Sequence, residues 1–268
     1  MKQLLDLVGK AKTYDLAQPY YVGMPHHPAH PPFLFSLSKK HGDMISPEGA
    51  SSAAETITFG GHVGTHIDAL CHFSCGGLLH GGHAAEAVQS YGKGLEQWSV
   101  DTMPPIVRRG VMLDIAKLAG VDELPEDFVI TPGLMEAAEA AHGVKAAAGD
   151  VVLLRTGWAR YWDDPRRYIR AQRGGVVYGP GPELPGAQWL STRRVFAGGS
   201  DTISFERVPM PNMPVHVHLL VESGIHIMEA LDMEQLSRDG VYEFLFVAAP
   251  LKFRGGTGSP VRPFALVV

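Results

Sequence analysis

The sequence has few of the features that mark secreted, membrane-spanning or disulfide-stabilised proteins. Its two cysteines, Cys71 and Cys75, are too few for a disulfide framework and lack the second pair of a zinc site, so we expect reduced packing residues. No apolar run approaches the roughly 20 residues of a membrane span. Asp6 interrupts the first leucines too early for a signal peptide. These absences predict a cytoplasmic protein with no membrane partner.

Long runs of one charge are also missing. The chain has 23 basic and 28 acidic residues, a net charge of -5, and no basic run longer than a pair, which argues against nucleic acid as a partner. It also lacks a Gly-x-Ser-x-Gly motif, which excludes the commonest serine-hydrolase arrangement. With no internal repeat or linker and 45% hydrophobic residues, the sequence predicts one folded domain over residues 1–268.

Secondary-structure signals alternate along the chain. Apolar and β-branched runs predict strands over residues 52–68, 105–115, 151–156, 195–198, 225–228 and 242–248. Capping and periodicity predict helices over residues 131–142, 183–191 and 215–223. The mixture indicates a compact α/β domain with a mixed or barrel-like β core and surrounding helices.

The densest concentration of chemistry lies between residues 60 and 72. Three imidazoles and one carboxylate occur there among glycines, namely His62, His66, Asp68 and His72. Histidine and aspartate are ligands of divalent metals in hydrolytic sites. A straight strand would separate the α-carbons of His62 and His66 by about 13 Å. We therefore expect the backbone to bend at Gly64, since glycine permits such a bend.

These residues carry a resemblance to a known family. The pattern from His62 to His72, His-x-Gly-Thr-His-x-Asp-x-x-x-His, resembles the signature of the metal-dependent cyclase family, which includes bacterial kynurenine formamidases and isatin hydrolases. Residues 14–16, 149–158, 199–202 and 255–263 are similar to further family blocks in the same order. One departure is Leu70, where the family usually has proline or a small residue.

The resemblance implies a swivelling β/β/α fold and a metal site. His62, His66 and Asp68 would hold one divalent ion, Zn or Mn, and Asp68 would bridge to a second. The other ligands of the second ion are implied to be a histidine on a helix and a carboxylate on the next strand. His216 and Glu229 fit that separation best, with His218 as the runner-up. The number of ions, one or two, stays open.

The expected reaction is metal-assisted hydrolysis. A divalent ion lowers the pKa of bound water toward about 7 and polarises a carbonyl. His72 lies outside the direct ligand spacing, so we expect it to take a proton from water and return it to the leaving nitrogen. The predicted substrate is a small aromatic or cyclic amide, either an arylformamide of the kynurenine type, from tryptophan catabolism, or a lactam or imide. The alternatives are lactone hydrolysis and a non-catalytic metal-binding or ligand-binding domain.

The sequence gives weaker indications of the residues that contact the substrate. We expect residues 24–33, rich in proline and histidine, to form an extended loop over the pocket and, with Leu70, to decide specificity. Candidates for an aromatic wall, which also fit a core role, are Phe35, Trp158 and Trp162. Candidates for pairing with a substrate carboxylate, which also fit salt bridges, are Arg155, Arg160 and Arg262. Family members imply a homodimer or a larger homo-oligomer.

Other polar residues are expected to be structural. Asp201, between a serine and a threonine, is typical of a turn cap. Glu222 is predicted to be a solvated helix residue, and His226 is placed outside the site because it alternates with isoleucines on a strand. The apolar tail, residues 264–268, is expected in the core or at a subunit contact.

Overall fold

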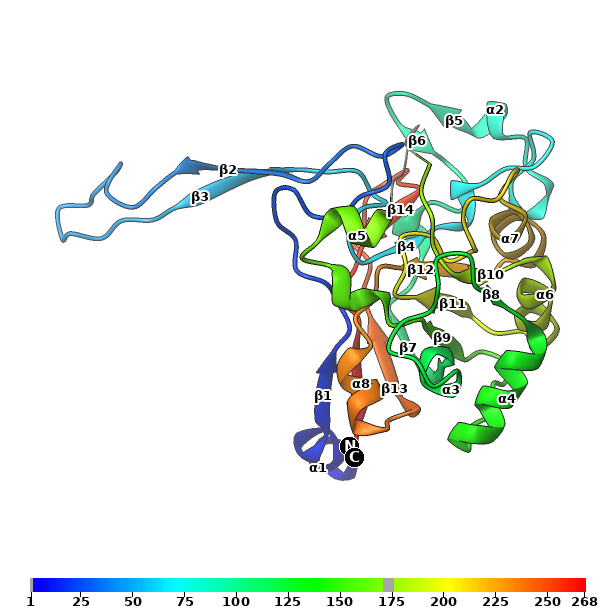
Figure 1. The fold of residues 1–268 in the computed structure, drawn as a ribbon. Helices are drawn as coiled ribbons and strands as arrows, with labels where there is room; N and C mark the ends of the chain where they lie inside the picture. The colour runs from blue at the N-terminus through cyan, green and yellow to red at the C-terminus, as the bar shows by residue number, and fades with distance from the viewer. Residues whose placement is uncertain (1, 171–175) are drawn as a thin grey trace.

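The computed structural model describes residues 2–170 and 176–268, which form a single α/β domain around a curled mixed sheet (Figure 1). The sheet has nine strands in the order β1-β15-β13-β7-β9-β11-β12-β4-β14. Its four middle strands, from β7 to β12, run parallel, and the flanking strands pair antiparallel. The predicted mixed sheet is therefore confirmed.

The strand bounds follow the sheet order. The central strands are β1 (Lys12–Asp15), β15 (Phe264–Val267), β13 (Glu243–Ala248), β7 (Ile106–Asp114), β9 (Val151–Arg155), β11 (Ala197–Ser200), β12 (His226–Glu229), β4 (His66–Asp68) and β14 (Gly258–Pro260). Three short pairs lie outside this sheet: β2 (Leu34–Lys39) with β3 (Ala54–Thr58), β5 (Gln89–Ser90) with β6 (Gly94–Leu95), and β8 (Val129–Ile130) with β10 (Gly181–Pro182).

The helices are mostly short. The α-helices are α1 (Lys2–Lys10), α2 (Ala85–Val88), α3 (Ile115–Leu118), α4 (Pro132–His142), α5 (Pro165–Ile169), α6 (Leu184–Thr192), α7 (Pro214–His216) and α8 (Glu234–Asp239). The 3-10 turns are η1 (Leu70–His72), η2 (His80–Gly82), η3 (Val100–Thr102) and η4 (Trp158–Tyr161), and η5 (Val217–Ser223) is a π-helix. In the described ranges, none of these helices is long and apolar enough to cross a membrane.

Burial of both sheet faces explains the apolar runs of the middle strands. Along β9, Val151 and Leu153 pack into one core cluster, whereas Val152 and Leu154 pack into another with residues of α4, α6 and η5. A strand covered on both faces reads as a continuous hydrophobic run. The parallel strands therefore occupy the centre of the domain, and their carboxyl ends lie along one edge.

A third core cluster lies near the proline-rich loop. It packs Met24 and Phe33, at the two ends of the predicted loop, against Trp158, Trp162 and Tyr168. The indole nitrogen of Trp162 also donates to the carbonyl oxygen of Pro19 at 2.8 Å. These contacts anchor the loop segment on the body of the domain.

The hairpin of β2 and β3 projects away from the body (Figure 1). The predicted strand over residues 52–68 is therefore wrong as a single element. It divides into β3 in the arm and β4 in the central sheet, joined by a turn that contains Gly64. Glycines at 60, 61 and 64 allow this break, because glycine adopts backbone conformations that other residues avoid.

Several local predictions are confirmed. Helix α4 begins after Thr131, whose hydroxyl accepts a hydrogen bond from the Leu134 amide, and it ends at Gly143 in the left-handed conformation. The predicted helix over residues 215–223 is present as α7 followed by η5. The tail forms β15 in the central sheet. Cys71 and Cys75 are both free thiols, but only Cys71 is buried, so the packing role predicted for Cys75 is wrong.

Candidate metal centre

The bend at Gly64 brings the first histidines together. Gly64 has a φ of +66°, and the ring centroids of His62 and His66 lie 5.4 Å apart. His66 and Asp68 lie on β4 two residues apart, so they share one face of the strand. The predicted bend is confirmed, although His62 lies in the turn before the strand and not on it.

A second segment delivers two more of the predicted ligands. Strand β12 lies beside β4, and the register pairs Glu229 with His66. His216 ends α7, buried at 4% exposure. Its ring faces Glu229, with 3.3 Å between Nε2 and Oε1. His218 instead contacts Ser191 and Glu222. The structure therefore places His216, and not His218, beside the centre.

Asp68 is at the centre of the cluster. Its Oδ1 lies 2.7 Å from His62 Nδ1 and 3.5 Å from His66 Nε2, and its Oδ2 lies 4.0 Å from His216 Nε2. Among the described residues, two sets of three side chains have ligand atoms within 4.8 Å of one another: His62, Asp68 and His72, and Asp68, His216 and Glu229. Asp68 belongs to both sets, as a bridging carboxylate would.

His66 lies between the two sets. Its Nδ1 lies 2.8 Å from the carbonyl oxygen of Gly64, which requires the proton on that nitrogen. The free Nε2 lies 3.4 Å from Glu229 Oε2 as well as near Asp68. The backbone thus fixes both the tautomer and the direction of the ring.

The cluster contains ionised side chains that are not fully hydrogen-bonded. Burial opposes ionisation of Asp68, but the surrounding imidazoles, with His62 at hydrogen-bond distance, hold its pKa below the ordinary value. Asp68 Oδ2 is buried without a hydrogen-bond partner. Burial also disfavours a charged His216, yet Glu206 and Glu229 raise its pKa to about 10. An ionised oxygen without a donor, beside ring nitrogens and a second carboxylate, fits a divalent cation.

His72 stacks on His62, with 3.7 Å between the ring centroids. Burial lowers the pKa of His72 to about 3, so its ring is neutral at physiological pH. The neutral ring presents a nitrogen lone pair, and the charge of Asp68 favours the protonated ring against the effect of burial. Because it also belongs to one of the two ligand sets, geometry alone permits both a base and a ligand, and the base role remains a prediction.

The histidines of the cluster and Glu229 line a cavity of about 320 Å³, and Asp68 lies behind them, outside the lining. The predicted loop contributes His27, Ala29 and His30, which confirms its position over the pocket. The other walls come from Phe73 and from residues 203–216. The apolar side chains among them are Ile203, Val208 and Met213. Ser204, also in the lining, has a buried hydroxyl with no hydrogen-bond partner.

The predicted aromatic wall is wrong. Trp158 and Trp162 are buried in the third core cluster, and Phe35 is exposed on the arm, so none of them lines the cavity. Leu70 also misses the cavity, because η1 turns it into the core beneath α6 and η5. The specificity role expected of Leu70 is therefore not supported by its position, and Phe73, three residues later, lines the cavity instead.

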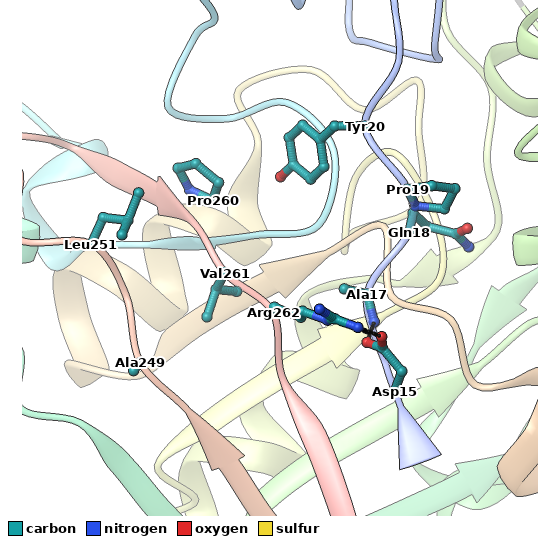
Figure 2. A pocket seen from close by; sticks show the side chains of 10 residues that line it. All are labelled: Asp15, Ala17, Gln18, Pro19, Tyr20, Ala249, Leu251, Pro260, Val261 and Arg262. Atoms are coloured by element: carbon teal, nitrogen blue, oxygen red, sulfur yellow. Dashed lines mark hydrogen bonds and ion pairs between the residues drawn. The ribbon is translucent and has the colours of Figure 1, made fainter. Parts of the chain in front are cut away.

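A larger groove of about 620 Å³ lies elsewhere on the surface (Figure 2). Its walls come from residues 15–20, 249–251 and 260–262. The charged side chains in this lining, Asp15 and Arg262, pair with each other at 2.6 Å. The groove contains no histidine and no free carboxylate among its described residues, so it is not the candidate metal centre.

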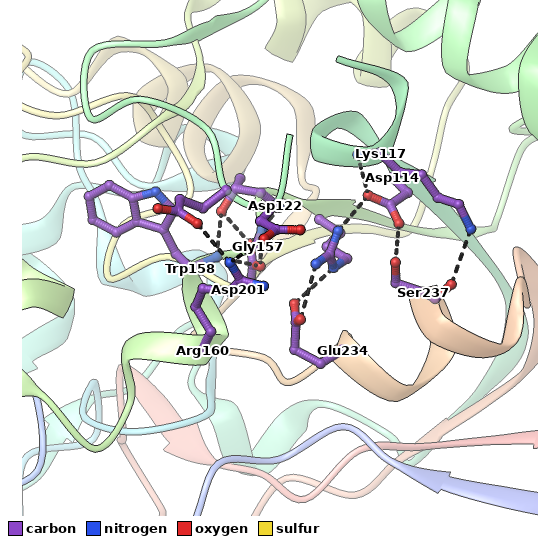
Figure 3. A network of polar contacts seen from close by, with 12 residues as sticks. Asp114, Lys117, Asp122, Gly157, Trp158, Arg160, Asp201, Glu234 and Ser237 are labelled. Atoms are coloured by element: carbon purple, nitrogen blue, oxygen red, sulfur yellow. Dashed lines mark hydrogen bonds and ion pairs between the residues drawn. The ribbon is translucent and has the colours of Figure 1, made fainter. Parts of the chain in front are cut away.

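The arginines suggested for a substrate carboxylate are all held by acidic residues, which contradicts that role. Arg155 is buried between Asp114 and Glu234, and Arg160 pairs with Asp122 and Glu123 (Figure 3 labels Arg160 and Asp122). Asp201 accepts hydrogen bonds from the amides of residues 156–158, as a turn cap does. His226 bonds the Asp68 carbonyl oxygen, and Glu222 is exposed.

One contributor was missed from the sequence. Glu206 accepts from His216 Nδ1 at 2.6 Å and from the His216 amide at 3.2 Å, and it is fully buried. This carboxylate orients the ring and directs Nε2 to the centre. An acidic residue between Phe205 and Arg207 has no periodic signal, and only the long-range contact with α7 identifies it.

Comparison with known proteins agrees with this geometry. A family model described as a putative cyclase matches residues 14–207. The chain belongs to this cyclase family. Isatin hydrolase from Roseibium aggregatum is 29% identical over 224 residues, which cover 82% of this chain and 77% of that relative. The family resemblance predicted from the sequence is thus confirmed.

Solved structures of this cyclase family share the fold. One described as a novel cyclase is 28% identical, with a TM-score of 0.86 over 99% of this chain and 90% of that chain. Isatin hydrolase A from Ralstonia solanacearum is 26% identical, with a TM-score of 0.78 over 100% of this chain and 97% of that chain. Both coverages are nearly complete, so the whole domain corresponds to the family fold.

Proposed function

We propose that this cyclase-family protein is a metal-dependent hydrolase that opens an amide C–N bond in a small, uncharged ring compound. The observation that carries the proposal is the donor-free Oδ2 of buried Asp68, which lies behind the imidazoles of His62, His66 and His216 that line the cavity. The relatives named isatin hydrolase support the reaction class.

The residues that would hold the metal are His62, His66, Asp68, His216 and Glu229. A divalent cation such as Zn²⁺ or Mn²⁺ would supply a Lewis acid for the carbonyl and a water of lowered pKa. Imidazole and carboxylate ligands suit both ions. His62, His66, His216 and Glu229 line the cavity, so an ion that they held would face it.

His72 would move the proton. Its neutral ring lies at the cavity wall, next to Asp68, and can take a proton from water as the oxygen adds to the carbonyl carbon. The C–N bond then breaks, and His72 returns the proton to the leaving nitrogen. The products are a carboxylate and an amine for a lactam, or a carboxylate and an amide for an imide, and both groups stay on one molecule when the substrate is a ring. Phe73, Ile203 and Val208 limit the access of bulk water.

The cavity lining favours an uncharged substrate. Among the described residues, it contains no lysine and no arginine. Burial lowers the pKa of His27, and burial together with neighbouring imidazoles lowers that of His30 to about 4, so both rings are neutral. A zwitterion such as N-formylkynurenine would lose hydration without gaining a partner for its carboxylate. A neutral lactam or imide with an aromatic ring avoids that cost.

A substrate panel tests this proposal. Protein loaded with Zn²⁺ or Mn²⁺ is assayed with isatin, a cyclic imide, an aromatic lactone and N-formylkynurenine. We expect kcat/KM for a cyclic amide to exceed that for N-formylkynurenine by at least about 100-fold. The reverse order would contradict the neutral-ring proposal, and a faster lactone reaction would assign ester hydrolysis instead. Metal uptake without any hydrolysis would favour a non-catalytic domain.

We also propose that the β2–β3 arm pairs with a second copy of this chain. Six large apolar side chains of the arm are between 47% and 71% exposed: Leu34, Phe35, Leu37, Met44, Ile45 and Ile57. An isolated two-stranded hairpin is marginal in water. A stable interface buries about 800 Å² per partner. In a dimer with twofold symmetry, each contact that the arm makes occurs twice.

Light scattering in solution tests this assembly. The wild-type protein is expected to have the mass of two copies, and Leu37→Glu with Ile57→Glu the mass of one. Both proteins are expected to bind metal, because the arm lies outside the metal centre. A monomeric wild-type protein would contradict the assembly without affecting the proposed reaction.

A further inference from the structure

Tyr20 contacts the metal motif from outside the cavity. It lines the groove of Figure 2 and is absent from the cavity lining. Its hydroxyl lies 2.9 Å from the carbonyl oxygen of Val63 and 2.7 Å from that of Thr65. These carbonyls flank Gly64, so one hydroxyl reaches both sides of the bend.

The ring of Tyr20 also fits the glycine. A Cβ atom added at Gly64 would lie 2.4 Å from Cζ of Tyr20, which leaves no space for any other residue. The positive φ of Gly64 disfavours a side chain independently. Tyr20 and Gly64 therefore form one packed unit, with the ring against the bend and the hydroxyl on its two carbonyls.

This unit determines the direction of His66. The Gly64 carbonyl, between the two held by Tyr20, accepts the His66 Nδ1 proton at 2.8 Å. That contact directs Nε2 toward Asp68 and Glu229. Rotation of the peptide planes at the bend would remove the acceptor and release the ring. Holding the bend therefore holds a ligand nitrogen in place.

The same segment reaches the second ligand strand. The Gln18 amide donates to the Thr65 hydroxyl at 2.8 Å, and that hydroxyl donates to the Ala230 carbonyl at 2.5 Å. Ala230 directly follows Glu229. Burial raises the pKa of Tyr20, so its hydroxyl remains a protonated donor. Residues 18–20 thus contact the first ligand segment directly, and Thr65 links that segment to the strand that carries Glu229.

We propose that Tyr20 is a positioning residue of the metal centre, which sets cation affinity by holding the bend at Gly64. The inference rests on the proposed function, because it concerns the same ion. Tyr20 touches neither the cavity nor the ligand atoms, so its effect passes through the backbone. A purely structural role would change stability without changing the affinity of the folded protein for the cation.

The test compares two tyrosines that are adjacent in sequence. Tyr20→Phe removes the hydroxyl from the bend, whereas Tyr21→Phe removes one that donates to the Trp162 carbonyl at 2.7 Å. The dissociation constants of Zn²⁺ and Mn²⁺ are measured on metal-stripped protein by competition with a chromogenic chelator. The unfolding midpoint of each metal-free variant is measured in parallel.

We expect Tyr20→Phe to weaken cation binding about tenfold or more, and Tyr21→Phe to stay within about twofold of the wild type. Equal affinities of Tyr20→Phe and wild type, or equal weakening in both variants, would overturn the positioning role alone. A wild-type protein that takes up no cation would overturn both this role and the proposed function. Cation uptake without hydrolysis would overturn only the proposed reaction.

Discussion

Two buried clusters of charge lie near the same edge of the sheet, and they differ in one respect. In the cluster of Asp114, Arg155, Glu234 and Ser237, Asp114 ends β7 and Arg155 ends β9, and each charged atom of these side chains has a partner; Figure 3 labels Asp114, Glu234 and Ser237. Arg155 bonds both oxygens of Glu234, and Ser237 donates to Asp114. In the metal centre, Asp68 keeps an oxygen without a partner, and Glu229 adds a second acid.

The difference separates structural charge from functional charge. A buried ion pair with all hydrogen bonds made needs nothing further, so the Arg155 cluster connects β7, β9 and α8. A buried carboxylate that lacks a donor is costly unless a cation completes it. The two clusters should therefore respond in opposite ways when a charge is removed or a metal is added.

The largest effect is expected at Asp68. Asp68→Asn removes the bridging charge, and we expect cation affinity to fall by at least about 100-fold and turnover to become undetectable. The matched control is Asp114→Asn in the Arg155 cluster. This variant should unfold more easily than the wild type but bind metal normally when folded. Metal content and turnover are measured on both. Normal metal content in Asp68→Asn would refute its central role.

Removing His72 should separate binding from turnover. We expect His72→Ala to lower kcat by about 10²- to 10⁴-fold while keeping the cation, because general-base catalysis is worth that much. His66→Ala should lose both. Single-turnover kinetics and metal analysis distinguish the cases. Loss of the cation in His72→Ala would make His72 a ligand, and unchanged turnover would remove its base role.

Removing the arginine of the Arg155 cluster should lower stability without changing metal binding. Arg155→Met leaves Asp114 and Glu234 without their cation, and we expect about 3–5 kcal/mol loss in the free energy of unfolding. Arg160, whose side chain is 34% exposed against 6% for Arg155, provides the control. Arg160→Met should cost at most about 1 kcal/mol. Denaturant unfolding measures both, and equal losses would contradict the distinction.

Cation binding should also release a proton. Because Glu206 and Glu229 raise the pKa of His216 to about 10, its ring is charged in the metal-free protein at pH 7. A cation at Nε2 displaces that proton, so affinity should rise with pH, by up to about tenfold per unit below that pKa. Calorimetry in two buffers of different ionisation enthalpy measures the release. Binding heats that do not depend on the buffer would contradict it.

The same charge predicts the pH dependence of the metal-free protein. The folded pKa of His216 lies above its ordinary value of 6.5, so its contribution to stability is fully present below that value. The contribution is lost as pH rises toward 10. A cation, which replaces the proton, should reduce this loss.

Much of the centre could be predicted from the sequence because its ligands are local. His62, His66, Asp68 and His72 lie within one short segment, and their spacing implies a bend that Gly64 permits. The buried runs of β7 and β9 and the capped helix α4 are also local signals. In each case, the residue types and their spacing within one segment are enough to predict the local structure.

The features that could not be predicted from the sequence depend on contacts between distant segments. Nothing near Glu206 indicates that it holds His216, and nothing near Tyr20 indicates that it packs on Gly64. The run from residue 52 to residue 68 read as one strand, because its alternation does not show that the first part leaves the body as an arm. Leu70 enters the core and Phe73, for which we expected no role, lines the cavity, because a 3-10 turn rotates the chain between them.

The most direct test of the account is a titration of metal-stripped wild-type protein with Zn²⁺ and Mn²⁺, followed by equilibrium dialysis and by the unfolding midpoint. We predict saturable uptake of one or two equivalents, a higher midpoint, and loss of both effects in Asp68→Asn. No uptake by the folded wild-type protein, or equal uptake by Asp68→Asn, would contradict the claim that the open charge at Asp68 is a cation site.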